Sequence, residues 1–195
     1  MMGKTHKFAG CFAMLVAFNI MEQKGLLLNG VSPLLQLAVM YPACSWASTA
    51  PDVDQGIEQI PEKTPISILL HKIVHIGKVR HRSWKTHSPF VWLVTCGVLW
   101  GLLYYLKLGM TDFIISRLLL TGLTVGWASH LISDAFTYQG IPLFGDKHLR
   151  LVPKKDAFKT NTTYETVVRR ILGVLIFILV IYMIIKHIEL PGVTL

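Results

Sequence analysis

Long apolar stretches constrain this chain more than any other feature. Five of them follow one another, over residues 8–21, 26–48, 90–108, 113–136 and 171–185. A helix needs about 20 apolar residues to span a bilayer, and several of these stretches reach that length. Of all residues, 52% are hydrophobic and only 15% are charged, which is too apolar for an ordinary soluble domain. The sequence predicts an all-α fold: a polytopic membrane protein of about four to five helices, forming a single domain over residues 1–195.

The first stretch is short, and a basic segment with Lys4, His6 and Lys7 precedes it. This order is typical of a signal peptide, but Glu22-Gln23-Lys24 follows where a cleavage site of small residues would stand. We therefore expect a first helix that begins after His6 and is tilted or only partly embedded. In the second stretch, Pro33 suits the first turn of a helix.

The distribution of basic residues predicts the orientation of the chain. Fifteen of the 19 Lys and Arg residues lie in residues 1–7, 51–89 and 138–170. With five membrane passes these segments share one side, which the positive-inside bias makes cytoplasmic. The net charge of +8 therefore indicates topology and contact with anionic lipid, and we expect no nucleic acid partner. Residues 66–76 have the amphipathic pattern of a helix lying at the interface.

Ionisable residues inside the fourth stretch mark a candidate site. His130 and Asp134 are four residues apart, so on a helix they share one face and can hold one cation between imidazole and carboxylate. Such groups are costly within a membrane helix and are functional candidates for that reason. The alternative is a buried histidine that only bonds to its helical neighbour.

Further ligand-type residues stand at the ends of other stretches. His6 precedes the first, Asp52 and Asp54 follow the second, and His87 precedes the third. In an up-and-down bundle these ends meet His130 and Asp134 on one face. Imidazole and carboxylate ligands suit zinc or manganese, and a pair of metals sharing a carboxylate is one use for so many ligands. Pairing of the carboxylates with Lys and Arg is the competing interpretation, but it does not explain why the histidines gather there.

Four motifs resemble those of the YdjM-type membrane-bound metal-dependent hydrolases. They are Thr5-His6, Pro51-Asp52-Val53-Asp54, the segment from His81 to Ser88, and Ser129-His130-Leu131-Ile132-Ser133-Asp134 followed by residues 137–143. The match covers roughly residues 3–145. The family commonly reads His-Arg-Gly-x-Thr-His-Ser, whereas this chain has Ser83-Trp84-Lys85 before Thr86, one residue more and without the glycine. Because of this extra residue, the spacing of His81 does not match the family motif, whereas His87 still matches it and stays a ligand candidate.

The resemblance implies a chemistry and a set of residues. The family is similar to the zinc-dependent phospholipase C and single-strand nuclease group, which implies phosphoester hydrolysis at clustered metals in a bacterial plasma membrane. The matching positions are His6, Asp52, Asp54, His81, His87, His130 and Asp134. The resemblance thus implies a divalent metal, zinc in the first place and manganese as the alternative.

The roles we expect follow from these residue types. The metal is bound by His87, His130, Asp134, Asp54 and His6, with His81 as a further candidate. Asp52 bridges or orients a ligand histidine, and a metal-activated water attacks the substrate. Arg82 and Lys85 hold an anionic group, since a guanidinium binds phosphate through its planar fork.

Other classes of protein stay open beside the hydrolase. A non-catalytic membrane protein that binds a metal or a partner would need the same ligands. A transporter is less well supported, because its ionisable residues would lie near the middle of the bilayer and the sequence has no visible repeat. We expect membrane lipid and an anionic, phosphate-containing substrate as partners, and the sequence leaves the oligomeric state open.

Overall fold

The structure is a computed structural model that describes residues 3–55, 63–77, 82–144, 147–159 and 162–187. Helices dominate these ranges, so the predicted all-α class is confirmed. In chain order the elements are α1 (Gly3–Gln23), α2 (Pro33–Ala47), the 3-10 helix η1 (Ala50–Asp54), α3 (Pro65–Ile76), α4 (Trp84–His87), α5 (Pro89–Tyr105), α6 (Met110–Ala135), β1 (Ile141–Pro142), β2 (His148–Leu149) and α7 (Thr163–His187).

Local sequence signals explain where several helices begin. Pro33 stands in the first turn of α2, as predicted, and its ring fits there because the first helical N–H groups need no partner within the helix. Helix α3 begins after Thr64, whose side chain accepts a hydrogen bond from the Ser67 backbone. Ser88 caps α5 in the same way by accepting from the backbone of Phe90.

The first helix starts earlier than the sequence suggested. We expected His6 to precede it, but α1 already begins at Gly3. His6 therefore lies in the opening turns of α1, where it is fully buried. The basic residues Lys4 and Lys7 are part of this helix, and neither is buried.

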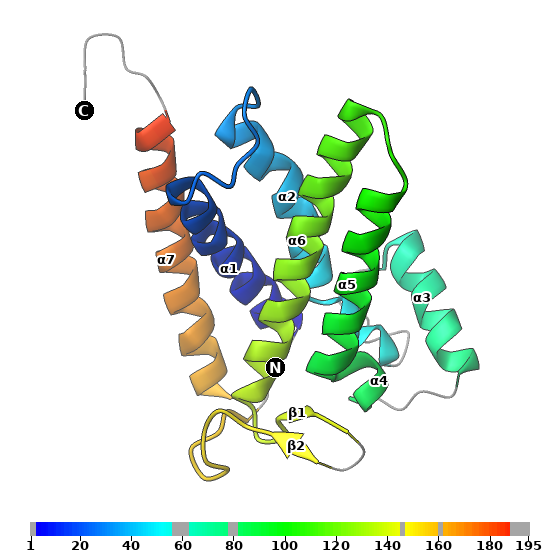
Figure 1. The fold of residues 1–195 in the computed structure, drawn as a ribbon. Helices are drawn as coiled ribbons and strands as arrows, with labels where there is room; N and C mark the ends of the chain where they lie inside the picture. Colours follow the sequence, from blue (N-terminus) through cyan, green and yellow to red (C-terminus); the bar gives the residue numbers. More distant parts are fainter. Residues whose placement is uncertain (1–2, 56–62, 78–81, 145–146, 160–161, 188–195) are drawn as a thin grey trace.

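The long helices form an up-and-down bundle in which α6 lies between α2 and α5 (Figure 1). Helices α2 and α6 run side by side in the same direction. Their backbones approach closely at two glycines: a Cβ at Gly122 would collide with the carbonyl oxygen of Met40, and one at Gly126 with that of Cys44. Small residues four apart allow helices to pack this closely in membranes. Helices α2 and α6 are thus packed backbone against backbone.

Two of the described helices, α6 and α7, are long and apolar enough to cross a membrane. In α7 the most apolar window has a mean hydropathy of 2.5, and only 6% of it is buried within the protein. Such a surface suits contact with lipid. Helices α2, with 15 residues, and α5, with 17, fall short of the roughly 20 that span a bilayer. The number of membrane crossings therefore stays a prediction.

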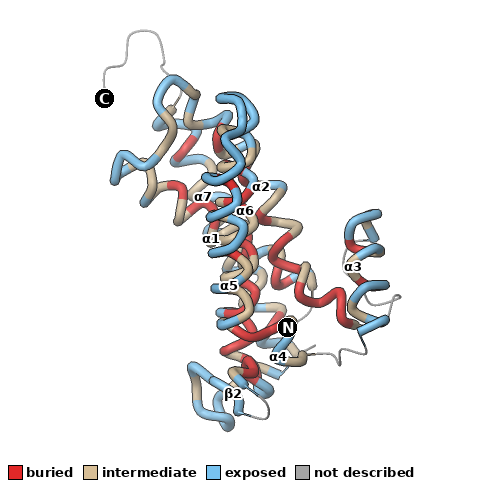
Figure 2. Tube along the Cα trace, turned by 45° about the vertical axis from the view of Figure 1, so that its right-hand side comes forward, coloured by how far each residue is buried: buried red, intermediate tan, exposed pale blue. Residues whose placement is uncertain are grey.

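Helix α3 lies apart from the bundle (Figure 1), and most of its surface is exposed (Figure 2). It is held to the end of α2 and to η1 by polar contacts. Trp46 Nε1 donates to Ser67 Oγ at 3.0 Å, and His71 Nδ1 donates to the carbonyl of Val53 at 2.8 Å. On its outer face Ile66, Leu69, Ile73 and Ile76 are exposed, as expected of a helix at a membrane interface.

Candidate metal centre

Four elements bring six ligand-type side chains together at one end of the bundle. They come from α1, η1, α4 and the last turns of α6, and each is at most 4% exposed. The six are His6, Asp52, Asp54, His87, His130 and Asp134. The up-and-down arrangement expected from the sequence therefore does bring these residues to one place. His81, the seventh candidate, lies outside the described residues.

His130 is oriented by the end of α2. Its Nδ1 lies 2.8 Å from the carbonyl oxygen of Ser48, and since a carbonyl can only accept, Nδ1 must carry the proton. The other nitrogen, Nε2, therefore presents a lone pair, and it is buried with no hydrogen-bond partner among the described residues. It lies 3.6 Å from Asp134 Oδ2, which confirms that the i, i+4 pair shares one face. A hydrogen bond behind a histidine ring is the usual way in which a metal ligand is held.

His6 covers the other side of His130. The two rings stack with their centroids 4.0 Å apart and an interplanar angle of 23°. His6 Nε2 lies 3.4 Å from Asp134 Oδ1, yet neither ring nitrogen of His6 makes a hydrogen bond within the described part of the chain. Two fully buried nitrogens without partners are unusual, because each such group costs about 1–3 kcal/mol.

Asp52 faces the same centre. Its Oδ1 lies 3.6 Å from His87 Nε2 and 3.9 Å from His130 Nε2. Its Oδ2 is buried without a hydrogen bond in the described structure. Asp134 Oδ2 lies 3.9 Å from the same nitrogen of His87. Asp52 and Asp134 thus contribute one carboxylate each to a ring of three imidazoles.

Asp54 lies behind His87 rather than in front of it. Its Oδ2 accepts from the Thr86 hydroxyl at 2.6 Å and lies 3.3 Å from His87 Nδ1. Since the single hydroxyl proton of Thr86 goes to Asp54, Thr86 can accept from His87 Nδ1–H at 2.9 Å. From sequence we expected Asp54 as a ligand and Asp52 in a bridging or orienting role. In the structure Asp52 faces the ring and Asp54 contacts His87 from behind, and the ligand roles of both stay predictions.

Arg82 closes one side of the ring. Its Nη2 donates to Asp134 Oδ1 at 2.9 Å, its Nη1 to Thr137 Oγ1 at 3.2 Å, and its backbone N–H to Asp54 Oδ2 at 3.0 Å. The backbone of Arg82 has a φ of 56°, in the left-handed region that a non-glycine residue adopts only when contacts such as these hold it there. Lys85, the other expected anion-binding residue, makes no such contact with the ring.

Charges within the ring stabilise one another. Burial alone would raise the pKa of Asp52, but the imidazoles of His130, His87 and His6 outweigh it and hold that pKa well below its ordinary value. Burial would lower the pKa of His87, but the carboxylates of Asp52 and Asp54 beside it raise the pKa to about 9. Without a metal, His87 therefore carries a proton at neutral pH and pairs with these carboxylates.

The spacing of the ligand atoms fits a metal ion better than a set of hydrogen bonds. Their separations of 3.4 to 3.9 Å are longer than the roughly 2.7–3.2 Å of a hydrogen bond. Four ligands about 2.1 Å from a tetrahedral ion lie about 3.4 Å from one another. Among the residues that the structure describes, two groups have ligand atoms that lie within 4.8 Å of each other, namely His6 with His130 and Asp134, and Asp52 with His87 and His130. These buried His and Asp clusters could hold a metal ion.

Sequence reasoning missed the residues that orient the ligands. Ser48 acts through its backbone carbonyl, so its side-chain identity carries no signal. His71 lies 18 residues from Val53 in sequence, and its hydrogen bond to that carbonyl fixes the peptide between Asp52 and Asp54. Neither contact has a pattern in the sequence from which it could be found.

Comparison with known proteins assigns the chain to a family. A family model described as YdjM inner membrane protein matches residues 1–190, nearly the whole chain. Searches of curated proteins and of solved structures found no match. The matched range includes all of the candidate ligand residues. The chain belongs to the YdjM inner membrane protein family.

Proposed function

We propose that this chain is a membrane-bound, metal-dependent hydrolase that acts on a phosphoester or a lipid-linked phosphate. The observation that carries the proposal is the buried ring of three imidazoles and two carboxylates, in which His6, Asp52 and His130 present buried atoms without hydrogen bonds among the described residues. Leaving four such atoms unsatisfied would cost on the order of the stability of a small domain. A bound cation offsets this cost.

The residues of the ring divide the work. His6, His87, His130, Asp52 and Asp134 hold the ion, which we expect to be zinc. When bound, such an ion lowers the pKa of water toward neutrality and polarises a phosphoryl oxygen. Asp52 Oδ2 accepts a proton during the reaction, because its Oδ1 faces the imidazoles and Oδ2 has no hydrogen bond in the described structure. Arg82 orients Asp134 and offers its guanidinium to an anionic group.

The shape of the protein beside the ring supports an amphiphilic substrate. An apolar cavity of about 370 Å³ lies next to η1, lined by Val53, Thr86 and Trp127 among others. Thr86, which lines this cavity, also lies 2.9 Å from Nδ1 of His87, so the cavity adjoins the ring at His87. An acyl chain in this cavity would place its headgroup near the ion. We propose that this end of the bundle faces the cytoplasm, since most basic residues lie there.

The test is hydrolysis by the purified, zinc- or manganese-loaded chain. The panel contains bis(p-nitrophenyl) phosphate, p-nitrophenyl phosphate, phosphatidylglycerol and phosphatidic acid. His130→Ala should abolish activity, and His187→Ala is the matched control because His187 pairs with Glu22 at the opposite end of the bundle. Activity that survives in His130→Ala would contradict the proposal. A loaded chain that hydrolyses nothing would favour the second candidate, a non-catalytic metal-binding or partner-binding protein.

A further inference from the structure

A basic pocket adjoins the metal centre on the side of Arg82. It has a volume of about 410 Å³ and is lined by Arg82, Tyr138, Gln139, His148, Arg150 and Lys154. Volumes of this size are typical of small-molecule sites. Three of the lining residues are permanently cationic, and none of those described is a carboxylate. Such a lining is complementary to an anion.

The pocket is built by the segment that follows α6. The backbone of Leu151 donates to the carbonyl of Ala135 at 2.9 Å, and that of Tyr138 donates to Phe158 at 3.0 Å. Gly140 has a φ of 69°, and a Cβ there would collide with the carbonyl oxygen of Leu149. The turn at Gly140 therefore lets residues 147–151 return to the end of α6.

Two of the cationic side chains in this pocket, Arg150 and Lys154, contact Tyr138. Arg150 Nε donates to the Tyr138 carbonyl at 2.9 Å, and Lys154 Nζ lies 4.5 Å from the centre of the Tyr138 ring. The hydrogen bond and charge of Lys154, with the charges of Lys159 and Arg150, lower the pKa of Tyr138, which indicates a positive potential there. Arg82 Nε, at the inner wall, is buried without a hydrogen bond in the described structure.

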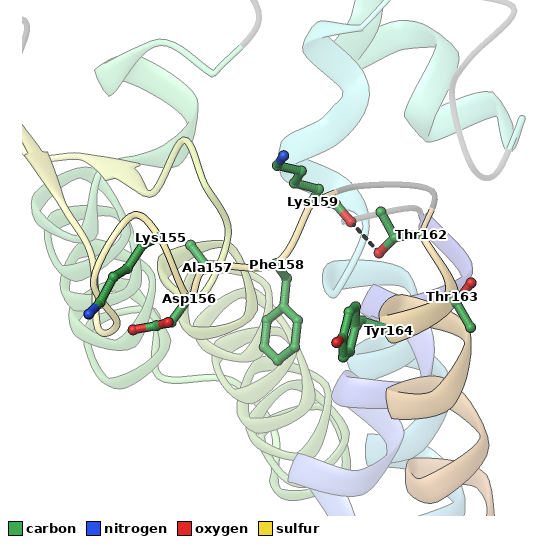
Figure 3. A pocket seen from close by; sticks show the side chains of 8 residues that line it. All are labelled: Lys155, Asp156, Ala157, Phe158, Lys159, Thr162, Thr163 and Tyr164. Carbon is green, nitrogen blue, oxygen red and sulfur yellow. Dashed lines mark hydrogen bonds between the residues drawn. The ribbon is translucent and has the colours of Figure 1, made fainter.

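A second pocket also has lysines in its lining, but it lacks the features that point to a phosphate site. It has a volume of about 640 Å³ and lies between residues 155–159 and the start of α7 (Figure 3). Lys155 and Asp156 both line it, so its charges are mixed. None of the metal-ligand candidates that the structure describes lines this second pocket. The pocket at Arg82, by contrast, shares a residue with the ring, because Arg82 also bonds to Asp134.

We propose that the pocket lined by Arg82, Arg150 and Lys154 is an anion subsite that binds a phosphate group of the substrate, an assignment that rests on the proposed phosphoester hydrolase. Arg82 joins the subsite to the centre through Asp134. Arg82 already donates from Nη1 and Nη2 to Thr137 and Asp134, and Arg150 donates from Nε to Tyr138. The remaining N–H groups of the two guanidinium groups suit a phosphate, and Lys154 adds a third donor. The substrate class is thus a phosphoester whose anionic group sits against the segment of residues 138–154.

The test measures phosphate binding without relying on hydrolysis. The full chain is purified in a neutral detergent and stripped of metal, and binding of inorganic phosphate is measured by calorimetry. In Arg150→Gln/Lys154→Gln we expect at least ~10-fold weaker binding. The matched control is Lys147→Gln/Lys155→Gln, which removes the same charge from the same segment outside the pocket and should change affinity less than about twofold. Lys154→Gln alone, at an exposed side chain, guards against misfolding of the double variant.

Two further arms identify the source of the phosphate. Glycerol 3-phosphate in solution is compared with phosphatidic acid in phosphatidylcholine nanodiscs. Binding of both supports a free phosphate group, and binding of phosphatidic acid alone supports a lipid headgroup. Equal losses in the two double variants, or no binding by the unmodified chain at tens of millimolar phosphate, would overturn the subsite. If the chain bound phosphate specifically but the metal-loaded chain hydrolysed no substrate, only the proposed function would be contradicted. If Arg150→Gln/Lys154→Gln hydrolysed substrate as well as the unmodified chain, only the subsite would be contradicted.

Discussion

His130 donates a hydrogen bond from Nδ1 to the carbonyl oxygen of Ser48, 82 residues away and 2.8 Å distant. This bond is the last step of a regular ladder between α6 and α2. Each step advances four residues on both helices, and the pairs are Gly122 with Met40, Gly126 with Cys44, and His130 with Ser48. Close packing of the two glycines therefore sets the position of a metal ligand one turn further on.

The ladder predicts that a glycine remote from the ion controls metal binding. Gly126→Val should force α6 away from the Cys44 carbonyl, destabilise the protein by about 1–3 kcal/mol and weaken metal binding by an order of magnitude or more. Gly97→Val is the control, because a Cβ at Gly97 meets nothing within 4 Å. Thermal unfolding and metal titration check both variants. Equal metal affinity in the two would show that the ladder does not position His130.

The presence of His130 in both candidate ligand groups predicts how many metal ions the chain binds. Only Nε2 of this residue is available, since Nδ1 bonds to Ser48, and both candidate ligand groups contain His130. We therefore expect about one tightly bound ion per chain by elemental analysis, and almost none in His130→Ala. His187→Ala should keep its metal. Full occupancy in His130→Ala would refute the assignment. His71→Ala is a poorer control, because His71 holds the peptide between Asp52 and Asp54.

The position of Asp54 predicts a graded effect of the two carboxylates. Asp54→Asn removes the negative charge beside His87 Nδ1 and leaves a single acceptor oxygen for Thr86 and the Arg82 backbone, so metal affinity should fall roughly 10- to 100-fold. Asp52→Asn should reduce it further, since Asp52 faces the ring. Asp112→Asn, exposed in the first turn of α6, should have no effect. If metal titration showed Asp54→Asn to be the more severe change, Asp54 would be the ligand.

The raised pKa of His87 predicts that protons and metal compete. In the metal-free protein this pKa is about 9 against an ordinary 6.5, so the proton on His87 stabilises the fold fully below pH 6.5, and that contribution is lost as pH rises through about 9. Metal needs the unprotonated ring, so metal affinity should rise with pH over the same range. Calorimetry at pH 7 in two buffers of different ionisation enthalpy should detect proton release on binding. Affinity that does not change between pH 6 and 9 would contradict this.

The topology predicts which loops can be labelled from outside. In a chain without its native cysteines, Lys155→Cys should react with an impermeant maleimide only after the cells are opened. Asn29→Cys, in the loop between α1 and α2 at the other end of the bundle, should react in intact cells. Labelling of Lys155→Cys from outside would place the ring on the opposite face of the membrane.

The sequence by itself determined the features that depend on near neighbours. Apolar stretches marked the long helices, Pro33 marked the start of α2, and the spacing of His130 and Asp134 placed both on one face. These features follow from the helical period and from caps, which involve residues only a few positions apart. The sequence also placed His6, Asp52 and His87 at one end of the bundle. This follows from the up-and-down order of the helices, in which alternate helix ends face the same side.

Only the tertiary structure decided which atoms meet within that end. The positions of Asp52 at the ring and of Asp54 behind His87 depend on the turn of η1 and on the hydroxyl of Thr86. The orientation of His130 depends on a backbone carbonyl, which every residue has, so no side-chain pattern encodes it. The convergence of Arg82 with Arg150 depends on how the segment after α6 folds back at Gly140. Distances of a few ångströms between residues far apart in sequence are set by packing, and the local pattern does not contain them.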